Sequence, residues 1–186
     1  MIFVGTIAGF TAVSGFSQLN APRNLSLAKG SKLWIEGTST VKSFTCAAEK
    51  VDVSVVAETD ASAADMIKSA SLTVPVASLD CGNKTMDEHM RKALKVSANP
   101  QISWKMSSYK VDGTNVVITG SLTIAGKENP IELRGAGTVD ASGTVRLKGK
   151  KEFKMTEYGV KPPTLMLGTM KVRDPVSVGF DLVLNP

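Results

Sequence analysis

The chain has 186 residues, of which 42% are hydrophobic, 21% are charged and only 5% are aromatic. This balance excludes an intrinsically disordered protein, and the length suits one folded domain with an aliphatic core. The formal net charge of +5 would permit a nucleic-acid or anionic membrane partner, but lysine and arginine are mostly scattered singly rather than gathered in a patch.

The first segment, "MIFVGTIAGFTAVSGFSQ", is apolar almost throughout and has no charged side chain before Arg23. It is too short and too rich in glycine and threonine for a membrane span, but it has the length of a secretory h-region. Gly15 and Ser17 supply small residues before a cleavage site. We therefore expect a signal peptide over residues 1–17, a periplasmic or secreted protein, and no stable membrane span in the mature chain. A helix packed on the domain is the alternative.

Cys46 and Cys81 are the only cysteines. In an exported protein two cysteines usually form a disulfide, so we expect a Cys46–Cys81 bridge. Neither cysteine belongs to a CxxC motif, and a single histidine cannot complete a Cys/His zinc site with them.

The segment "NKTMDEHMRKALKV" interrupts a chain that otherwise alternates between apolar and polar residues. Asn83 or Thr85 can cap a helix near residues 84–96, and Pro100 ends the segment. The apolar stripe of this helix would consist of Met86, Met90, Leu94 and Ala93.

The alternating segments predict half-buried strands, each with one apolar face. Links such as "VDGTN", "AGKENP" and "VDASGTV" carry glycine beside asparagine or aspartate, as hairpin turns do. We therefore expect one all-β domain over residues 25–186, a mostly antiparallel barrel or sandwich. The inward positions would be Leu72, Val74 and Val76; Ile102, Trp104 and Met106; Val116, Ile118, Leu122 and Ile124; and Val176, Val178, Phe180, Leu182 and Leu184.

The densest basic run is "RLKGKKEFK", residues 146–154. Alternation would place Arg146, Lys148 and Lys150 on one strand face, which is typical of a solvated surface. The run lacks a series of interleaved aromatic residues on which bases could stack. We therefore expect no nucleic-acid partner.

His89 is the only histidine and follows Asp87 and Glu88, so a base with an orienting carboxylate can be imagined. Adjacent helix residues do not face each other, and the chain has no GxSxG motif and no metal-ligand spacing. The carboxylates of Asp87 and Glu88 are expected at the surface. We expect no enzymatic activity, no metal and no cofactor; an enzyme acting on a lipid with His89 as base is kept as an alternative.

A barrel of this size can hold one apolar ligand, or its aliphatic faces can pack against each other, and periodicity leaves both open. The stretch "MDEHMRKALKVSANPQISWKMSSYKVDGTNVVITGSLTIAGKENPIELRG" resembles the YceI-like, polyisoprenoid-binding or lipid-binding family. The matching positions are His89, Arg91, Pro100, Gly120, Leu122, Thr123, Ile124, Gly126, Pro130, Ile131 and Leu133.

The resemblance implies a lipocalin-like antiparallel barrel with an elongated apolar cavity for an isoprenoid or another long-chain amphiphile, in a protein exported to the periplasm. On that basis we expect a binding, carrier or sequestering protein with His89 as a local polar anchor or mouth residue. A ligand-free structural or stress-related barrel is the alternative, and the oligomeric state, dimer included, stays open. The expected cavity lining comprises Ile102, Trp104, Met106, Ile118, Leu122, Ile124, Phe153, Phe180 and Leu182.

Overall fold

The fold is taken from a computed structural model, which describes residues 22–58, 66–165 and 169–186. The predicted signal peptide, residues 1–17, lies outside the described residues. Strands dominate the rest of the chain, with one α-helix and two short 3-10 helices among the described residues. The elements are β1 (Arg23–Leu27), β2 (Lys32–Ser39), β3 (Ser43–Ala48), β4 (Asp52–Ala57), β5 (Ile67–Pro75), η1 (Val76–Ser78), β6 (Leu79–Asp80), α1 (Lys84–Ala93), β7 (Gln101–Asp112), β8 (Asn115–Ile124), β9 (Lys127–Val139), β10 (Val145–Lys154), η2 (Met155–Tyr158), β11 (Thr164–Leu165) and β12 (Met170–Asn185).

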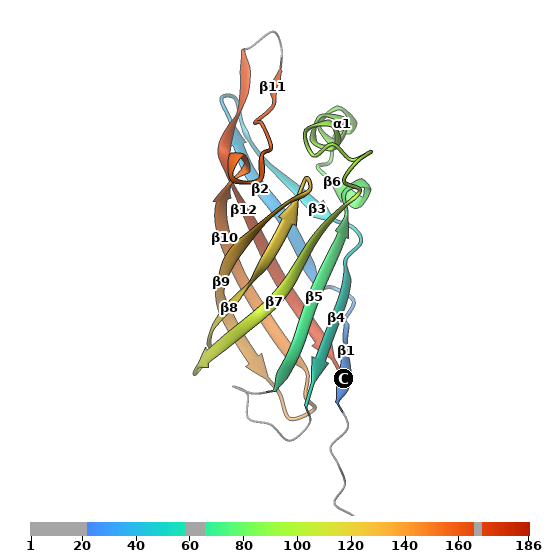
Figure 1. The fold of residues 1–186 in the computed structure, drawn as a ribbon, viewed down its shortest axis with the longest axis vertical. Helices are drawn as coiled ribbons and strands as arrows, with labels where there is room; N and C mark the ends of the chain where they lie inside the picture. The colour runs from blue at the N-terminus through green and yellow to red at the C-terminus, as the bar shows by residue number, and fades with distance from the viewer. Residues whose placement is uncertain (1–21, 59–65, 166–168) are drawn as a thin grey trace, which may run out of the picture.

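The strands form an antiparallel barrel, elongated along its axis (Figure 1). Its ring runs β1–β4–β5–β7–β8–β9–β10–β12 and closes because the end of β12 pairs with β1, where Asn185 lies opposite Ser26. Further up, β12 pairs instead with β2, which continues the wall through β3 and β6. The expected all-β, lipocalin-like barrel is confirmed.

Strand register aligns the predicted apolar faces toward the interior. Trp104 on β7 lies between Leu72 on β5 and Leu122 on β8, so three alternating patterns meet on one inner surface. The three predicted hairpin links are turns, and Gly113 (φ 58°) and Gly126 (φ 81°) adopt positive φ angles that glycine accepts without strain.

The outer face of β10 is basic and exposed, as its alternation predicts. Lys148 forms an ion pair with Asp181 at 3.2 Å, and Lys150 pairs with Glu36. Arg146 is exposed beside them on the same face. These cations therefore belong to a solvated outer wall rather than to the interior.

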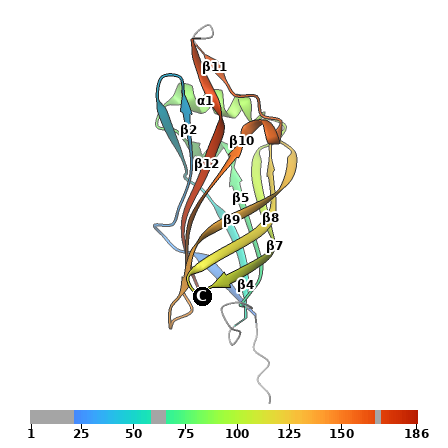
Figure 2. The ribbon, with the colours of Figure 1, turned by 90° about the vertical axis from the view of Figure 1, so that its left-hand side faces the viewer.

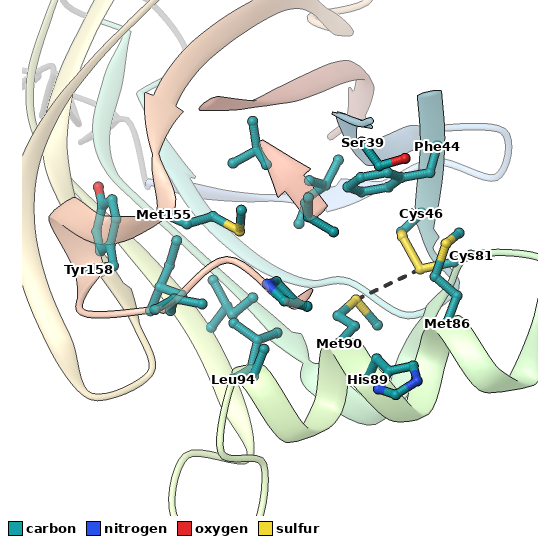
Figure 3. Close-up of a pocket in the computed structure, with 18 of the residues that line it drawn as sticks. Ser39, Phe44, Cys46, Cys81, Met86, His89, Met90, Leu94, Met155 and Tyr158 are labelled. Carbon is teal, nitrogen blue, oxygen red and sulfur yellow. Dashed lines mark hydrogen bonds between the residues drawn. A yellow bond between two sulfur atoms is a disulfide. The ribbon is translucent and has the colours of Figure 1, made fainter. Parts of the chain in front are cut away.

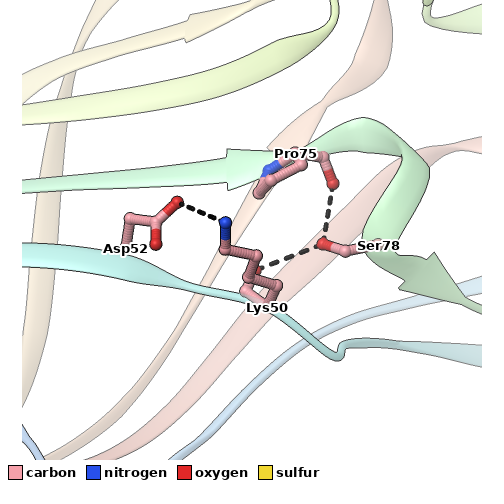
Figure 4. A network of polar contacts seen from close by, with 4 residues as sticks. All are labelled: Lys50, Asp52, Pro75 and Ser78. Atoms are coloured by element: carbon pink, nitrogen blue, oxygen red, sulfur yellow. Dashed lines mark hydrogen bonds and ion pairs between the residues drawn. The ribbon is translucent and has the colours of Figure 1, made fainter.

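The 3-10 helix η1 joins β5 to β6 and lies beside the β3–β4 connection (Figure 4). The Ser78 hydroxyl bridges the carbonyls of Pro75 at 2.8 Å and Lys50 at 3.2 Å, while Lys50 forms an exposed ion pair with Asp52 at 3.6 Å.

Val76 was expected on a strand face, but β5 ends at Pro75. The Val76 N–H bonds instead to the carbonyl of Pro100 at 2.9 Å, and its side chain is still buried.

Helix α1 lies across the upper end of the barrel, at the opposite end from the C-terminus (Figure 2). The Asn83 side chain caps it by accepting a hydrogen bond from the Met86 N–H at 3.1 Å. The expected disulfide is confirmed: Cys46 on β3 is bonded to Cys81, just before the helix. This bridge ties α1 to the barrel wall.

The expectation of a surface-exposed Asp87 is wrong. Its side chain is buried, and its Oδ1 accepts a hydrogen bond from the backbone N–H of Cys81 at 2.8 Å. The next residue, Glu88, is exposed as expected. Asp87 therefore fastens the first turn of α1 to the disulfide loop.

Candidate ligand-binding site

Three apolar cavities follow one another along the barrel interior, with volumes of about 140, 130 and 370 Å³ from the helix end downward. The upper and middle cavities share Ile102, Ile124 and Phe153 in their walls. The middle and lower cavities share Trp104 and Leu182. The shared walls place the cavities in series, as an elongated binding site would require.

The middle cavity is lined entirely by apolar residues. Leu122 and Phe180 belong to its wall, with Ile118 at its border with the lower cavity. No charged or hydroxyl-bearing residue lines this part of the barrel. An alkyl or isoprenoid chain is the kind of group that such a surface accepts, because it has no hydrogen bonds to lose.

Trp104 marks the boundary between the middle and lower cavities. Its indole lies against Gly120 of β8, where a Cβ atom would approach Nε1 to 2.8 Å. The same Nε1 is buried without a hydrogen-bond partner among the described residues. Gly120 thus makes room for the ring within the wall, which accounts for a glycine in the middle of a strand.

The lower cavity extends to the β7–β8 turn and contains Met106 of β7. Tyr109 is also in its wall, and its hydroxyl accepts a hydrogen bond from the Ile67 N–H at 2.9 Å. The described residues at this end of the site offer neutral hydroxyl groups and aliphatic side chains, and no charged residue is among them.

The upper cavity lies between helix α1 and the barrel wall (Figure 3). Met86, Met90 and Leu94 form the helix side of its lining, as their spacing predicts. The disulfide closes the cavity on the β3 side, and the Met90 Sδ lies 3.9 Å from the Cys81 Sγ. Flexible thioethers can adapt their shape to a variable guest.

The polar residues of the upper cavity that reach solvent form what we call its rim, whereas Tyr158 is buried. They include Ser39 and Lys42 of the β2–β3 hairpin and His89 of α1. No aspartate or glutamate is among the described residues that line this cavity. The rim therefore presents hydrogen-bond donors and positive charge without a compensating carboxylate.

His89 has no carboxylate partner for general-base chemistry. Asp87 is turned to Cys81, and no hydrogen bond joins His89 to another described side chain. Within residues 22–58, 66–165 and 169–186, no three His, Cys, Asp or Glu side chains gather as a metal site would require. Nor is any helix in this part of the chain long and apolar enough to cross a membrane.

All ten residues predicted to bind ligand line the cavities. Their contact with a ligand stays a prediction. Sequence reasoning missed several others, among them Phe44 and Tyr158 in the upper cavity. Tyr158 packs edge-on against Phe153 with ring centroids 5.3 Å apart. Burial first, and the charge of Glu157 second, raise the pKa of the Tyr158 phenol.

A closed antiparallel barrel with one helix across its upper end and an apolar interior defines the chain as a lipocalin-like barrel protein. The sequence profile of the YceI-like domain matches residues 7–184, so the chain belongs to the YceI-like family.

Similar sequences include a UPF0312 protein of Pseudomonas aeruginosa, 30% identical over 106 residues that cover 53% of each chain. Another, from Enterobacter sp., is 33% identical over 93 residues, or 42% of this chain and 48% of the relative. The chain thus spans about half the length of the curated relatives it matches.

Two solved structures share the fold. BcnA of Burkholderia cenocepacia superimposes with a TM-score of 0.70 and 24% identity over 82% of this chain and 95% of that one. A polyisoprenoid-binding domain of Saccharophagus degradans, implicated in plant cell wall breakdown, gives a TM-score of 0.65 with 16% identity over 87% and 97% of the two chains.

Proposed function

We propose that this protein binds one isoprenoid or another long-chain amphiphile, with the chain along the three cavities, and acts as a carrier or sequestering protein. The observation that carries the proposal is the series of apolar cavities, because filled barrels leave no such space. Membership in the YceI-like family and the fold of the polyisoprenoid-binding domain support it.

The energetics favour a long chain over a compact ligand. Each buried methylene contributes about 0.8 kcal/mol, so affinity grows with the length of chain that the cavities enclose. The middle cavity offers no polar partner, which disfavours ligands with groups along the chain that need hydrogen bonds.

The upper rim is the proposed position of the polar head group. Lys42 and His89 there would favour an anionic or hydrogen-bond-accepting head, whereas the described residues of the lower cavity present only neutral polar groups. The ligand would then lie with its head under α1 and its tail toward the β7–β8 turn.

We also propose that the protein works without catalysis, in the periplasm or outside the cell. The disulfide supports an oxidising compartment. No described carboxylate forms a hydrogen bond with His89, which supports binding rather than turnover.

A titration with a fluorescent fatty acid, followed by competition with polyprenols, polyprenyl phosphates and fatty acids of increasing length, tests the proposal. Saturable binding at one site per chain, with competitors gaining strength as they lengthen, is expected. Equal competition by short and long chains would contradict a site that runs the length of the barrel.

A further inference from the structure

At the upper end of the barrel, the β2–β3 hairpin lies beside β12 (Figures 1 and 2). The β2–β3 turn is joined to β12 by the Thr40 N–H, which donates to the carbonyl of Lys171 at 2.9 Å. In return the Lys171 N–H donates to the Thr40 hydroxyl at 3.2 Å. We call residues 40–42 and 169–173, with Lys161 of the segment that leads into β11, the upper tip.

The turn at the upper tip is ordered and exposes a valine. The Ser39 hydroxyl accepts hydrogen bonds from the N–H groups of Val41 and Lys42, at 3.2 and 3.1 Å, and donates to the Lys42 carbonyl at 2.9 Å. Val41 is 69% exposed, more than any other large hydrophobic residue described. A single exposed apolar side chain is common on protein surfaces, so Val41 gains its meaning only from the charges around it.

The upper tip is also strongly basic. It carries Lys42, Lys161, Lys171 and Arg173, all exposed, and no acidic residue, whereas the whole chain has a formal charge of only +5. None of these four cations forms an ion pair with a described residue, although five other lysines and arginines do. The positive charge here is therefore free to meet an external anion.

The upper tip adjoins the rim of the upper cavity. Lys42 and Met170 of the upper tip both line the upper cavity. An exposed apolar residue surrounded by lysines, next to the opening of an apolar cavity, is the arrangement that a surface with anionic groups over a hydrocarbon layer would complement.

We propose that the upper tip docks on an anionic lipid surface, with Val41 inserted among the head groups and the four cations over anionic lipids. Docking places the rim of the upper cavity at the membrane interface, where a chain can pass between bilayer and barrel without crossing water. This inference goes beyond the binding function proposed above. It is tested without any bound amphiphile, so either can fail alone.

The first experiment uses tryptophan as a reporter at the two exposed valines. Val41→Trp lies at the upper tip, and Val139→Trp is its matched control near the β9–β10 turn at the other end of the barrel. Vesicles of equal parts phosphatidylcholine and phosphatidylglycerol should shift the emission of Val41→Trp to the blue beyond that of the parent protein. The shift that the same vesicles cause in the emission of Val139→Trp should equal the shift in the parent protein.

The second experiment removes charge. Lys42→Gln with Lys171→Gln should weaken co-sedimentation with these vesicles by about thirtyfold, since each lysine near an anionic surface supplies roughly a five- to sixfold gain. Lys105→Gln with Lys110→Gln, on the exposed face of β7, is the control and should bind as the parent does. Vesicles of phosphatidylcholine alone should bind all of these proteins weakly.

Several results would overturn docking at the upper tip. These are no association of the parent protein with phosphatidylglycerol vesicles, equal losses in the two double variants, or a blue shift in Val139→Trp alone. If Lys42→Gln with Lys171→Gln fails to fold in a thermal melt, the comparison of Val41→Trp with Val139→Trp decides alone.

Discussion

The carboxylate of Asp87 accepts a hydrogen bond from the backbone N–H of Cys81 at 2.8 Å, so one side chain joins helix α1 to the disulfide that closes the upper cavity. Asp87→Ala should lower the free energy of unfolding by about 1 to 3 kcal/mol, because it leaves a partly buried N–H without an acceptor. Asp87→Asn keeps an acceptor oxygen and should cost less. Urea denaturation measures both.

Glu88→Ala is the matched control for Asp87, since Glu88 is the exposed neighbour on the same helix. Its effect should stay within about 0.5 kcal/mol. Equal losses in Asp87→Ala and Glu88→Ala would show that the contact with Cys81 does not stabilise the helix.

The disulfide closes a loop with a sequence separation of 35 residues. Replacing Cys46 and Cys81 together by serine should cost about 3 to 4 kcal/mol in the chain-entropy estimate for a loop of this size. The variant should also release α1 and weaken amphiphile binding, because Cys46 and Cys81 line the upper cavity. Denaturation and titration test the two effects separately, and an unchanged unfolding midpoint would contradict the first.

Leu122 lines the middle cavity of about 130 Å³, which has room for a larger side chain. Leu122→Trp should fold and should weaken binding of a long-chain amphiphile by about tenfold or more, as the ring displaces roughly two methylenes. In a filled core the same change would instead cost about 1 to 3 kcal/mol. Lys105→Trp puts the same ring on the outer face of β7 and should leave binding unchanged.

His89 sits at the rim of the upper cavity without a catalytic partner. His89→Ala should therefore fold normally and weaken amphiphile binding by no more than about tenfold, the scale of one hydrogen bond. Incubation of the parent protein with fatty acyl and prenyl esters should yield no product by mass spectrometry. Hydrolysis or isomerisation that disappears in His89→Ala would contradict a purely binding role.

Asp174 of β12 holds η2 in place by accepting hydrogen bonds from the Thr156 hydroxyl at 2.6 Å and the Thr156 N–H at 2.9 Å. The hydroxyl bond is the main cause that lowers the pKa of Asp174 below its usual value of 3.8. Because the pKa of Asp174 is lower in the folded than in the unfolded chain, its ionised carboxylate stabilises the fold at a pH above the unfolded-state pKa. This stabilisation is lost as the pH falls through the folded-state pKa.

Asp174→Asn should therefore be less stable than the parent at neutral pH, and the difference should shrink as the pH falls below about 4. Thermal melts across this range check the sign. Asp112→Asn, an exposed aspartate near the β7–β8 turn, is the control and should show no such convergence. A difference that grows toward acid would contradict the account.

Period-two alternation predicted an antiparallel sheet and most of its inner face, whereas the choice of a barrel over a sandwich came from the resemblance to the YceI-like family. Alternation placed both Trp104 and Leu122 on an inner face. That they lie opposite each other depends on a register shift between Met106 and Ser108 in the β7–β8 pairing, which alternation did not predict. Phe44 and Tyr158 were missed because their place in the upper cavity depends on pairing between β2 and β12 and on the 3-10 helix η2. No local pattern encodes these long-range contacts.

The open interior could not be predicted from the sequence either. Aliphatic faces that meet across a barrel look the same in sequence whether they touch or leave a cavity, since the difference lies in the radius of the closed wall. Likewise, Asp87 looked like a surface carboxylate until the disulfide loop supplied its N–H partner.

Native mass spectrometry of the purified protein tests the central claim, that the barrel encloses one long-chain amphiphile. After purification without detergent from a bacterial host, the parent protein should carry one amphiphile per chain, released on denaturation and recovered by lipid extraction, and Leu122→Trp should carry less. A parent protein whose native mass equals its sequence mass, and which stays so after incubation with polyprenyl phosphates and long-chain fatty acids, would contradict the account.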